Sequence, residues 1–142
     1  MEDDLRNLIT VLNLDPVEAD HASLENILTC SQWKLRSKTS VEAAIALLQE
    51  SRVPVLFCET DQRLGHWQKT LDQVMSLPDP PYLIVTSRLA DDRLWAEALN
   101  LGAYDVLAKP FDRTEVTRIV GSACARWDHR QPIAAKSRSC AA

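Results

Sequence analysis

The stretch Val53-Pro-Val-Leu-Phe-Cys-Glu59, in the middle of a chain of 142 residues, decides the fold class. It is an apolar run without polar alternation, which indicates a strand buried on both faces, as in a parallel sheet. Pro54 is compatible with the start of a strand, where the ladder does not need its missing N–H. The run ends abruptly at Glu59. Because ligands of open parallel sheets bind beyond the carboxyl ends of the strands, Glu59 is the first candidate site residue.

Four more strand-like runs and five helical patterns surround this stretch. The predicted strands are Leu8–Leu14, Trp33–Ser37, Val53–Glu59, Tyr82–Thr86 and Tyr104–Ala108. The predicted helices are Asp20–Gln32, Thr39–Ser51, Trp67–Met75, Ala90–Leu101 and Asp112–Trp127. This alternation predicts an α/β fold with a doubly wound parallel sheet, for which the common five-stranded order is 2-1-3-4-5.

Several residues are expected to start, end or orient these helices. Thr39 and Glu42 fit a capping box, Asp112 fits an N-cap, and Gly102 fits a left-handed stop. Helical periodicity places Met75 and Leu101 on the apolar faces of their helices. The domain is expected to span residues 8–127, between an N-terminal extension of residues 1–7 and a flexible tail of residues 128–142.

Composition and charge exclude several classes of protein. The formal net charge is −4, which argues against a nucleic-acid-binding surface. No apolar run approaches the roughly 18 residues of a membrane span, and the acidic start Met-Glu-Asp-Asp is unlike a secretory leader. The four cysteines show neither paired nor metal-binding spacing, so we expect reduced thiols in a cytoplasmic protein. His21 and His66 are expected in surface loops.

In the 2-1-3-4-5 order, the first, third and fourth strands end side by side. Asp15 follows the first strand, Glu59 and Thr86 are the last residues of the third and fourth, and Lys109 follows the fifth. The sequence therefore predicts an acidic crevice at this edge of the sheet. Taken alone, Asp15 could also cap its loop as an Asx-turn. We interpret Asp61 as a turn residue, and Cys58 as facing the core on the other side of the sheet.

At two places the chain resembles the receiver domains of bacterial two-component response regulators. The runs are Tyr82-Leu-Ile-Val-Thr-Ser87 and Leu101-Gly-Ala-Tyr-Asp-Val-Leu-Ala-Lys-Pro-Phe111. The resemblance covers about residues 8 to 127. It implies a flavodoxin-like fold and a role in phosphorelay signal transduction, with Glu59 at the phosphoacceptor position and Thr86 and Lys109 as switch residues.

The chain departs from the family pattern where the chemistry is carried. The resemblance places the family's acid pair on Asp15 and Pro16, its aspartate acceptor on Glu59 and its aromatic switch residue on Val106. Pro16 offers no side-chain oxygen to the octahedral shell of Mg²⁺. Glu59 has one methylene more than Asp, which displaces its carboxylate from the in-line position for phosphoryl transfer. We therefore expect a pseudo-receiver with little or no phosphorylation.

The resemblance also bears on cofactors. We expect no cofactor, or a weakly bound Mg²⁺ held by Asp15 and Glu59. A standing contact between Glu59 and Lys109 could hold an active-like arrangement without modification, or it could be purely structural.

Protein binding is the leading functional hypothesis: a stand-alone signalling module that is not an enzyme. In receivers, the fourth helix, fifth strand and fifth helix form the usual surface for a partner or a second copy. Here this surface would present Trp95 and Tyr104. A histidine kinase, a downstream signalling protein or a homodimer fits this expectation, and a nucleic acid or membrane does not. For Trp127 we favour packing in the core.

Three alternatives assign other chemistry to the same region. A phosphatase-like enzyme would use the acids Glu59 and Asp61, but Glu rather than Asp stands at the nucleophile position. A cysteine phosphatase would use Cys58 and Arg63, whose spacing is one residue short and whose loop lacks glycines. A flavodoxin-like cofactor binder needs a phosphate loop after the first strand, where this chain has acidic residues instead.

Overall fold

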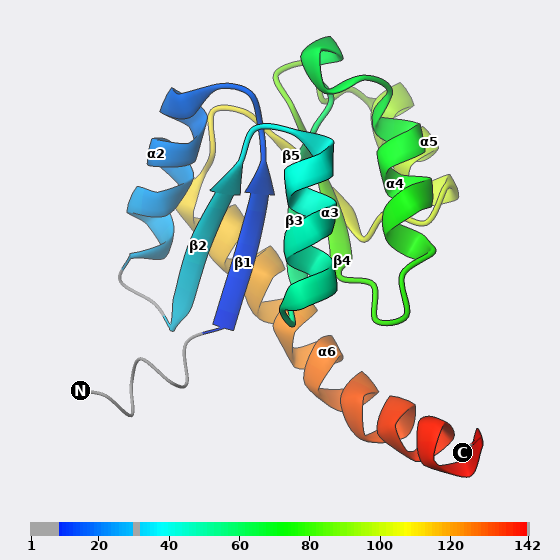
Figure 1. Cartoon of the computed structure of the whole chain (residues 1–142). Coiled ribbons are helices and arrows are strands. Elements are labelled where there is room, and N and C mark those ends of the chain that lie inside the picture. Colours follow the sequence, from blue (N-terminus) through cyan, green and yellow to red (C-terminus); the bar gives the residue numbers. More distant parts are fainter. Residues whose placement is uncertain (1–8, 30–31, 142) are drawn as a thin grey trace.

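The fold is an open parallel sheet covered by helices on both faces (Figure 1). The computed structural model describes residues 9–29 and 32–141, with side chains up to Arg130, Gln62 excepted. The strands are β1 (Ile9–Leu14), β2 (Trp33–Lys38), β3 (Val55–Glu59), β4 (Tyr82–Ser87) and β5 (Asp105–Ala108). All four neighbouring pairs are parallel and the order is β2-β1-β3-β4-β5, which confirms the predicted topology. The expected extension of residues 1–7 lies outside the described residues.

A helix follows each strand. They are α2 (Glu18–Leu28), α3 (Val41–Glu50), α4 (Trp67–Met75), α5 (Asp92–Asn100) and α6 (Arg113–Ala141), with a short 3₁₀ turn η1 (Gln62–Leu64) after β3. Helices α3, α4 and α5 cover one face of the sheet, and α2 and α6 cover the other (Figure 1). This is the doubly wound arrangement that right-handed crossovers produce.

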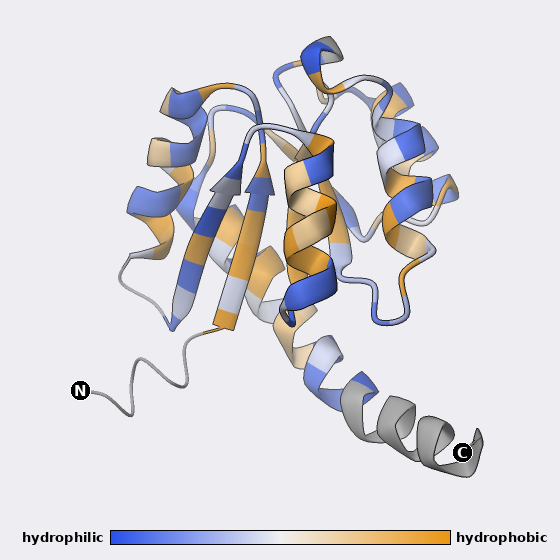
Figure 2. Cartoon of the chain, in the orientation of Figure 1, coloured by the Kyte–Doolittle hydropathy of each residue, from blue (hydrophilic) through white to orange (hydrophobic). Residues whose placement is uncertain are grey.

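Strand β3 is buried along its whole length and supplies both cores. Its alternate side chains separate as the pleat requires: Leu56 and Cys58 pack with α3 and α4, whereas Val55 and Phe57 pack with α2 and α6. Figure 2 shows apolar residues along β1 and on α3, which covers β3 in this view. Cys58 therefore lies in the core opposite Glu59, as predicted.

The same alternation assigns the predicted site residues to one face. Asp15 continues the side of Val11 and Asn13, Glu59 that of Phe57, and Thr86 that of Ile84. The site is therefore built on the α2/α6 face, at the carboxyl edge of the sheet.

Helix boundaries confirm two of the predicted caps and correct one. The Asp112 carboxylate accepts from the Glu115 N–H at 2.9 Å, and Gly102 has φ 106° at the end of α5. The N-cap of α3 is Ser40 rather than Thr39, because the Ser40 hydroxyl accepts from the Ala43 N–H at 3.2 Å. Because α3 begins at Val41, the residue before it, Ser40, is the N-cap, and its hydroxyl reaches the third amide of the helix.

Two apolar residues predicted to face inward lie on the surface instead. Met75 and Leu101 are 45% and 49% exposed; Met75 is the last residue of α4, and Leu101 is the C-cap of α5.

The last helix extends beyond its expected end at Trp127. Helix α6 continues through Ala141, although no apolar periodicity marks residues 128–142. Arg130 ties the helix to the domain one turn past Trp127, because it donates to the Pro80 carbonyl at 2.6 Å. None of the helices in the described ranges is long and apolar enough to cross a membrane.

Candidate functional site

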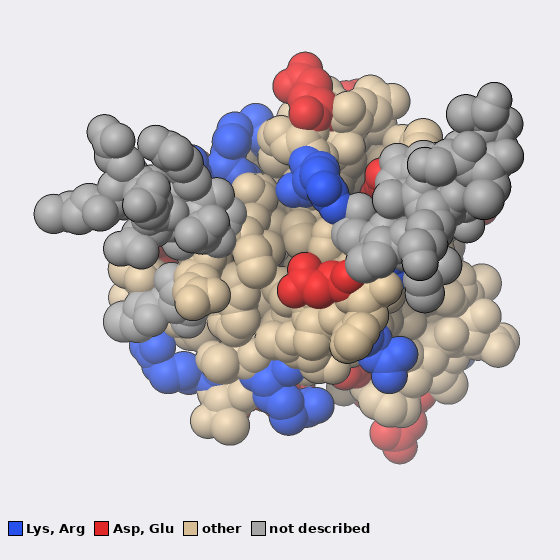
Figure 3. Space-filling view, turned by 90° about the horizontal axis from the view of Figure 1, so that it is seen from below, with Lys and Arg blue, Asp and Glu red and all other residues tan. Residues whose placement is uncertain are grey.

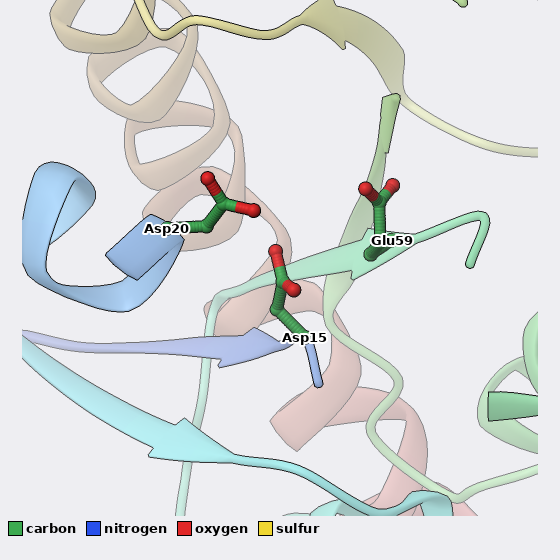
Figure 4. Close-up of side chains that lie close together, drawn as sticks. All are labelled: Asp15, Asp20 and Glu59. Carbon is green, nitrogen blue, oxygen red and sulfur yellow. The ribbon is translucent and has the colours of Figure 1, made fainter. Parts of the chain in front are cut away.

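The site is centred on the Lys109 ammonium, which contacts three carboxylates. Its Nζ lies 2.5 Å from Asp15 Oδ2, 2.9 Å from Asp20 Oδ2 and 2.7 Å from Glu59 Oε1. The three acids come from the end of β1, the first turn of α2 and the end of β3, and they converge in Figure 4. All four residues are buried. Three charge-assisted hydrogen bonds thus use every donor of this ammonium.

Asp15 serves both roles that its sequence position allowed. Its Oδ1 accepts from the Val17 N–H at 2.9 Å, which makes the Asx-turn at the end of β1. Its Oδ2 faces Lys109. The turn therefore fixes the carboxylate that the site uses.

Asp20 is a site residue that the sequence reasoning missed. It lies in the first turn of α2, where the Pro16-containing loop delivers it to the edge of the sheet. Its second oxygen, Oδ1, pairs with the guanidinium of Arg88 at 3.1 Å. Asp20 therefore supplies a carboxylate to the crevice where Pro16 offers none. Arg88, from the loop after β4, adds a second positive charge to the cluster through this pair with Asp20.

Glu59 has both carboxylate oxygens engaged. Oε1 contacts Lys109, and Oε2 accepts from the Thr60 N–H at 2.7 Å. Thr86 is the register partner of Glu59 across β3 and β4. Its hydroxyl is fully buried and has no hydrogen-bond partner among the described residues, so it remains an available donor at the site.

Burial and nearby charges shift the pKa values of two groups at the site, Lys109 and Cys58. Burial by itself lowers the pKa of Lys109, but hydrogen bonds from its ammonium to Asp15, Glu59 and Asp20 outweigh burial and raise the pKa above its ordinary value. Burial raises the pKa of the Cys58 thiol to about 12, and the charges of Glu59 and Asp15 add to this effect. Lys109 is therefore a permanent cation, and Cys58 is a neutral thiol rather than a nucleophile.

Asp61 is a turn residue, as predicted, and lies outside the carboxylate cluster. Its Oδ1 accepts from the Arg63 N–H at 2.8 Å, and its Oδ2 pairs with the Arg63 guanidinium at 2.8 Å. These hydrogen bonds lower the pKa of Asp61 to about 2. With Asp61 committed to Arg63, the pair of acids that the phosphatase-like alternative requires is not assembled.

His21 is buried beneath the cluster, whereas the sequence predicted a surface loop. Its Nε2 lies 2.6 Å from the Asp15 carbonyl oxygen, so Nε2 donates, and its Nδ1 accepts from the Asn13 amide at 2.9 Å. The signal was Asn13, a polar residue inside an otherwise apolar strand. His66 is exposed at the start of α4, as expected.

The carboxylates form a suitable oxygen donor set for a hard cation. One oxygen from each of Asp15, Asp20 and Glu59 lies within 4.8 Å of the others, and Mg²⁺ prefers carboxylate oxygens. The sequence predicted only Asp15 and Glu59 as ligands. Lys109 contacts the same oxygens, so a metal ion at this donor set would compete with its ammonium.

The three aromatic residues weighed as surface or core differ in exposure. Trp95 on α5 is 48% exposed, and Trp127 is buried, as predicted for each. Tyr104 is half-buried, and its hydroxyl lies 2.5 Å from the Ser122 hydroxyl, which adds a contact with α6.

Comparison with known proteins supports the fold through structure rather than sequence. No family model matches the chain. No curated protein matches it in sequence. A signal receiver domain from Vibrio parahaemolyticus matches with a TM-score of 0.81 and 14% identity, over 89% of this chain and 97% of that one.

Two other solved structures give the same result. The signal receiver domain of an HD domain-containing protein from Pseudomonas fluorescens matches with a TM-score of 0.78 and 20% identity, over 89% of this chain and 93% of that one. A response regulator from Thermotoga maritima matches with a TM-score of 0.73 and 17% identity, over 83% of this chain and 98% of that one. The chain thus has the flavodoxin-like fold of response regulator receiver domains, as predicted.

Proposed function

We propose that this chain is a receiver-like signalling module that acts by binding a protein partner and does not depend on phosphorylation. The observation that carries the proposal is the contact of Lys109 with Glu59 at 2.7 Å, reinforced by Asp15 and Asp20. The lysine at the switch position is already bound to a carboxylate from the acceptor position. These contacts therefore keep the side chains of the crevice in one arrangement without a phosphoryl group.

The state of Glu59 disfavours phosphoryl transfer. A nucleophilic carboxylate must present a free oxygen in line with the phosphorus atom. Both oxygens of Glu59 are hydrogen-bonded, one to Lys109 and one to the Thr60 amide. Attack would require breaking one of these buried contacts.

We propose that this crevice binds Mg²⁺ only weakly. Asp15, Asp20 and Glu59 would hold it, and it would neutralise negative charge among them. Lys109 and Arg88 already supply two positive charges to these three carboxylates. A metal ion would have to replace these ion pairs, and their loss would reduce the free energy gained when it binds.

The proposed partner is a histidine kinase, a downstream signalling protein or a second copy of this chain. The proposed location of this interaction is the cytoplasm. The proposed contact surface comprises α5, β5 and the first half of α6. Its large exposed hydrophobic side chains are Trp95 and, one turn further along α5, Leu99. Buried aromatic anchors dominate the energies of such interfaces. A nucleic-acid partner is not proposed, because the net charge is negative and the face in Figure 3 carries charges of both signs.

Sedimentation velocity and affinity capture from the source cell test this proposal. The wild-type chain is compared with and without acetyl phosphate and Mg²⁺. We expect the same association in both conditions, and capture that decreases when Glu59→Gln and Lys109→Met variants disrupt the crevice. Association that appears only with the phosphodonor would contradict the proposal.

A further inference from the structure

A hollow separate from the acidic cluster lies near the residues where β4 and β5 begin. In Figure 1 these strand starts are at the opposite end of the sheet from the ends that carry Glu59 and Lys109. The volume of the hollow is about 380 Å³. The residues that determine its chemistry are Tyr82, Tyr104, Arg126, Arg130 and Met75. None of them belongs to the acidic crevice.

Two arginine–tyrosine contacts form the polar wall of this hollow. The Arg130 guanidinium carbon lies 5.0 Å from the Tyr82 ring centroid, and that of Arg126 lies 5.9 Å from the Tyr104 ring centroid. The two tyrosine rings are 5.1 Å apart, so the two arginine–tyrosine contacts are neighbours in the wall. The Arg130 guanidinium carbon also lies 4.2 Å from the Trp127 ring centroid, and its Nη2 donates to a backbone carbonyl.

Two positive charges on one helix line this hollow. Arg126 and Arg130 are four residues apart on α6, a spacing at which like charges face each other and disfavour the helix. Among the described residues that line the hollow there is no Asp or Glu. Asp128 acts on Cys124, which belongs to the core on another side of the helix. An anion between the two arginines would remove this repulsion.

The remaining surface of the hollow suits a flat apolar group. Met75, Leu83 and Ala103 add apolar atoms to the two tyrosine rings. Gly102 also lines the hollow, and a Cβ at this position would meet no atom within 4 Å, so the wall is open there. Small-molecule sites combine such apolar and aromatic walls with a few placed polar groups, in volumes of roughly 300–1,000 Å³.

We infer that this hollow binds a small planar anion: one aromatic ring that carries a carboxylate or phosphate group. The anionic group lies between Arg126 and Arg130, whose forked donors match carboxylate and phosphate oxygens. The ring lies against Tyr82 and Tyr104. This inference does not depend on the function proposed for the acidic crevice.

Calorimetric titration of the full chain with two probes tests the inference. Benzoate represents a free aromatic carboxylate, and adenosine monophosphate represents a nucleotide. We expect saturable binding of at least one probe; the probe that binds more tightly identifies the source of the anionic group. Arg126→Gln is expected to weaken this binding about tenfold, as loss of one charge-assisted hydrogen bond would.

Arg118→Gln is the matched control, because Arg118 is an exposed arginine on the same helix that does not line the hollow. It is expected to leave binding unchanged. Thermal melting checks that both variants fold, which is expected because Arg126 is itself exposed. Failure of both probes to bind would overturn the inference, as would binding that Arg126→Gln and Arg118→Gln reduce equally.

Discussion

The ammonium of Lys109 lies 2.7 Å from the carboxylate of Glu59, fifty residues away in the sequence. Strand β4 separates the ends of β3 and β5 that carry them, so the lysine side chain reaches across one strand. Two further acids, Asp15 and Asp20, contact the same ammonium and complete a buried network. This contact links the two residues that the sequence resemblance places at the acceptor and switch positions.

The Glu59–Lys109 contact predicts strong coupling between the two residues in stability. Lys109→Met leaves three buried carboxylates short of one cation, and breaking a buried pair in this way costs about 3–5 kcal/mol. In a double-mutant cycle with Glu59→Gln, we expect a coupling of about 0.5–3 kcal/mol in the free energy of unfolding. Urea denaturation of the four proteins measures it. Additive losses would show that the two side chains do not interact.

Asp20 predicts a difference between two acids in the same turn of α2. Asp20→Asn removes the charge of one of the three carboxylates that contact Lys109 and of the carboxylate that pairs with Arg88, and we expect a loss of about 1–3 kcal/mol in the free energy of unfolding. Glu18→Gln is the control, because Glu18 is exposed in the first turn of the same helix and should change stability by less than about 0.5 kcal/mol. Equal effects of the two substitutions would remove Asp20 from the network.

Cys58 predicts a loss of stability at alkaline pH. Its pKa is raised from 9.0 to about 12 in the folded chain, mainly by burial. Above pH 9 the unfolded chain releases the thiol proton while the folded chain retains it, so stability falls as pH rises toward 12. Urea melts at about pH 8 and about pH 10 should show a larger decrease for the wild type than for Cys58→Ala. The same decrease in both proteins would mean that the thiol does not titrate in this way.

Much of the fold and part of the site followed from residues at the strand ends. The buried run Val53–Glu59 fixed a parallel sheet, and the position of Asp15, Glu59 and Lys109 after their strands predicted that they would meet. These predictions rest on two strong regularities, the burial of central parallel strands and the meeting of their carboxyl ends at one edge.

The residues that were missed lie where the local sequence does not determine whether a side chain faces the solvent or the site. Asp20 stands inside a helical pattern, so whether it faces solvent or the crevice depends on how the loop at Pro16 aims α2. His21 was missed for the same reason, although Asn13 in strand β1 signalled a buried polar partner. The length of α6 beyond Trp127 was missed because its continuation carries no apolar periodicity.

Trp95 predicts a loss of binding without a loss of folding. It is 48% exposed on α5, so truncation should leave the core intact, while an aromatic anchor removed from an interface often costs 2 kcal/mol or more. We expect Trp95→Ala to weaken self-association or partner capture and to leave the thermal midpoint nearly unchanged. Asn100→Ala, also exposed on α5, is the control. A large drop in the midpoint with association preserved would place Trp95 in the core instead.

Intact-mass measurement after incubation with acetyl phosphate and Mg²⁺ tests the central claim most directly. Glu59 has both oxygens engaged and Lys109 is already neutralised, so we predict that the mass of the wild-type chain does not change. The variant Pro16→Asp with Glu59→Asp places aspartates where the sequence resemblance expects them, and it shows whether the fold can be phosphorylated under the same conditions. A stable gain of one phosphoryl group on Glu59 of the wild-type chain would contradict the account.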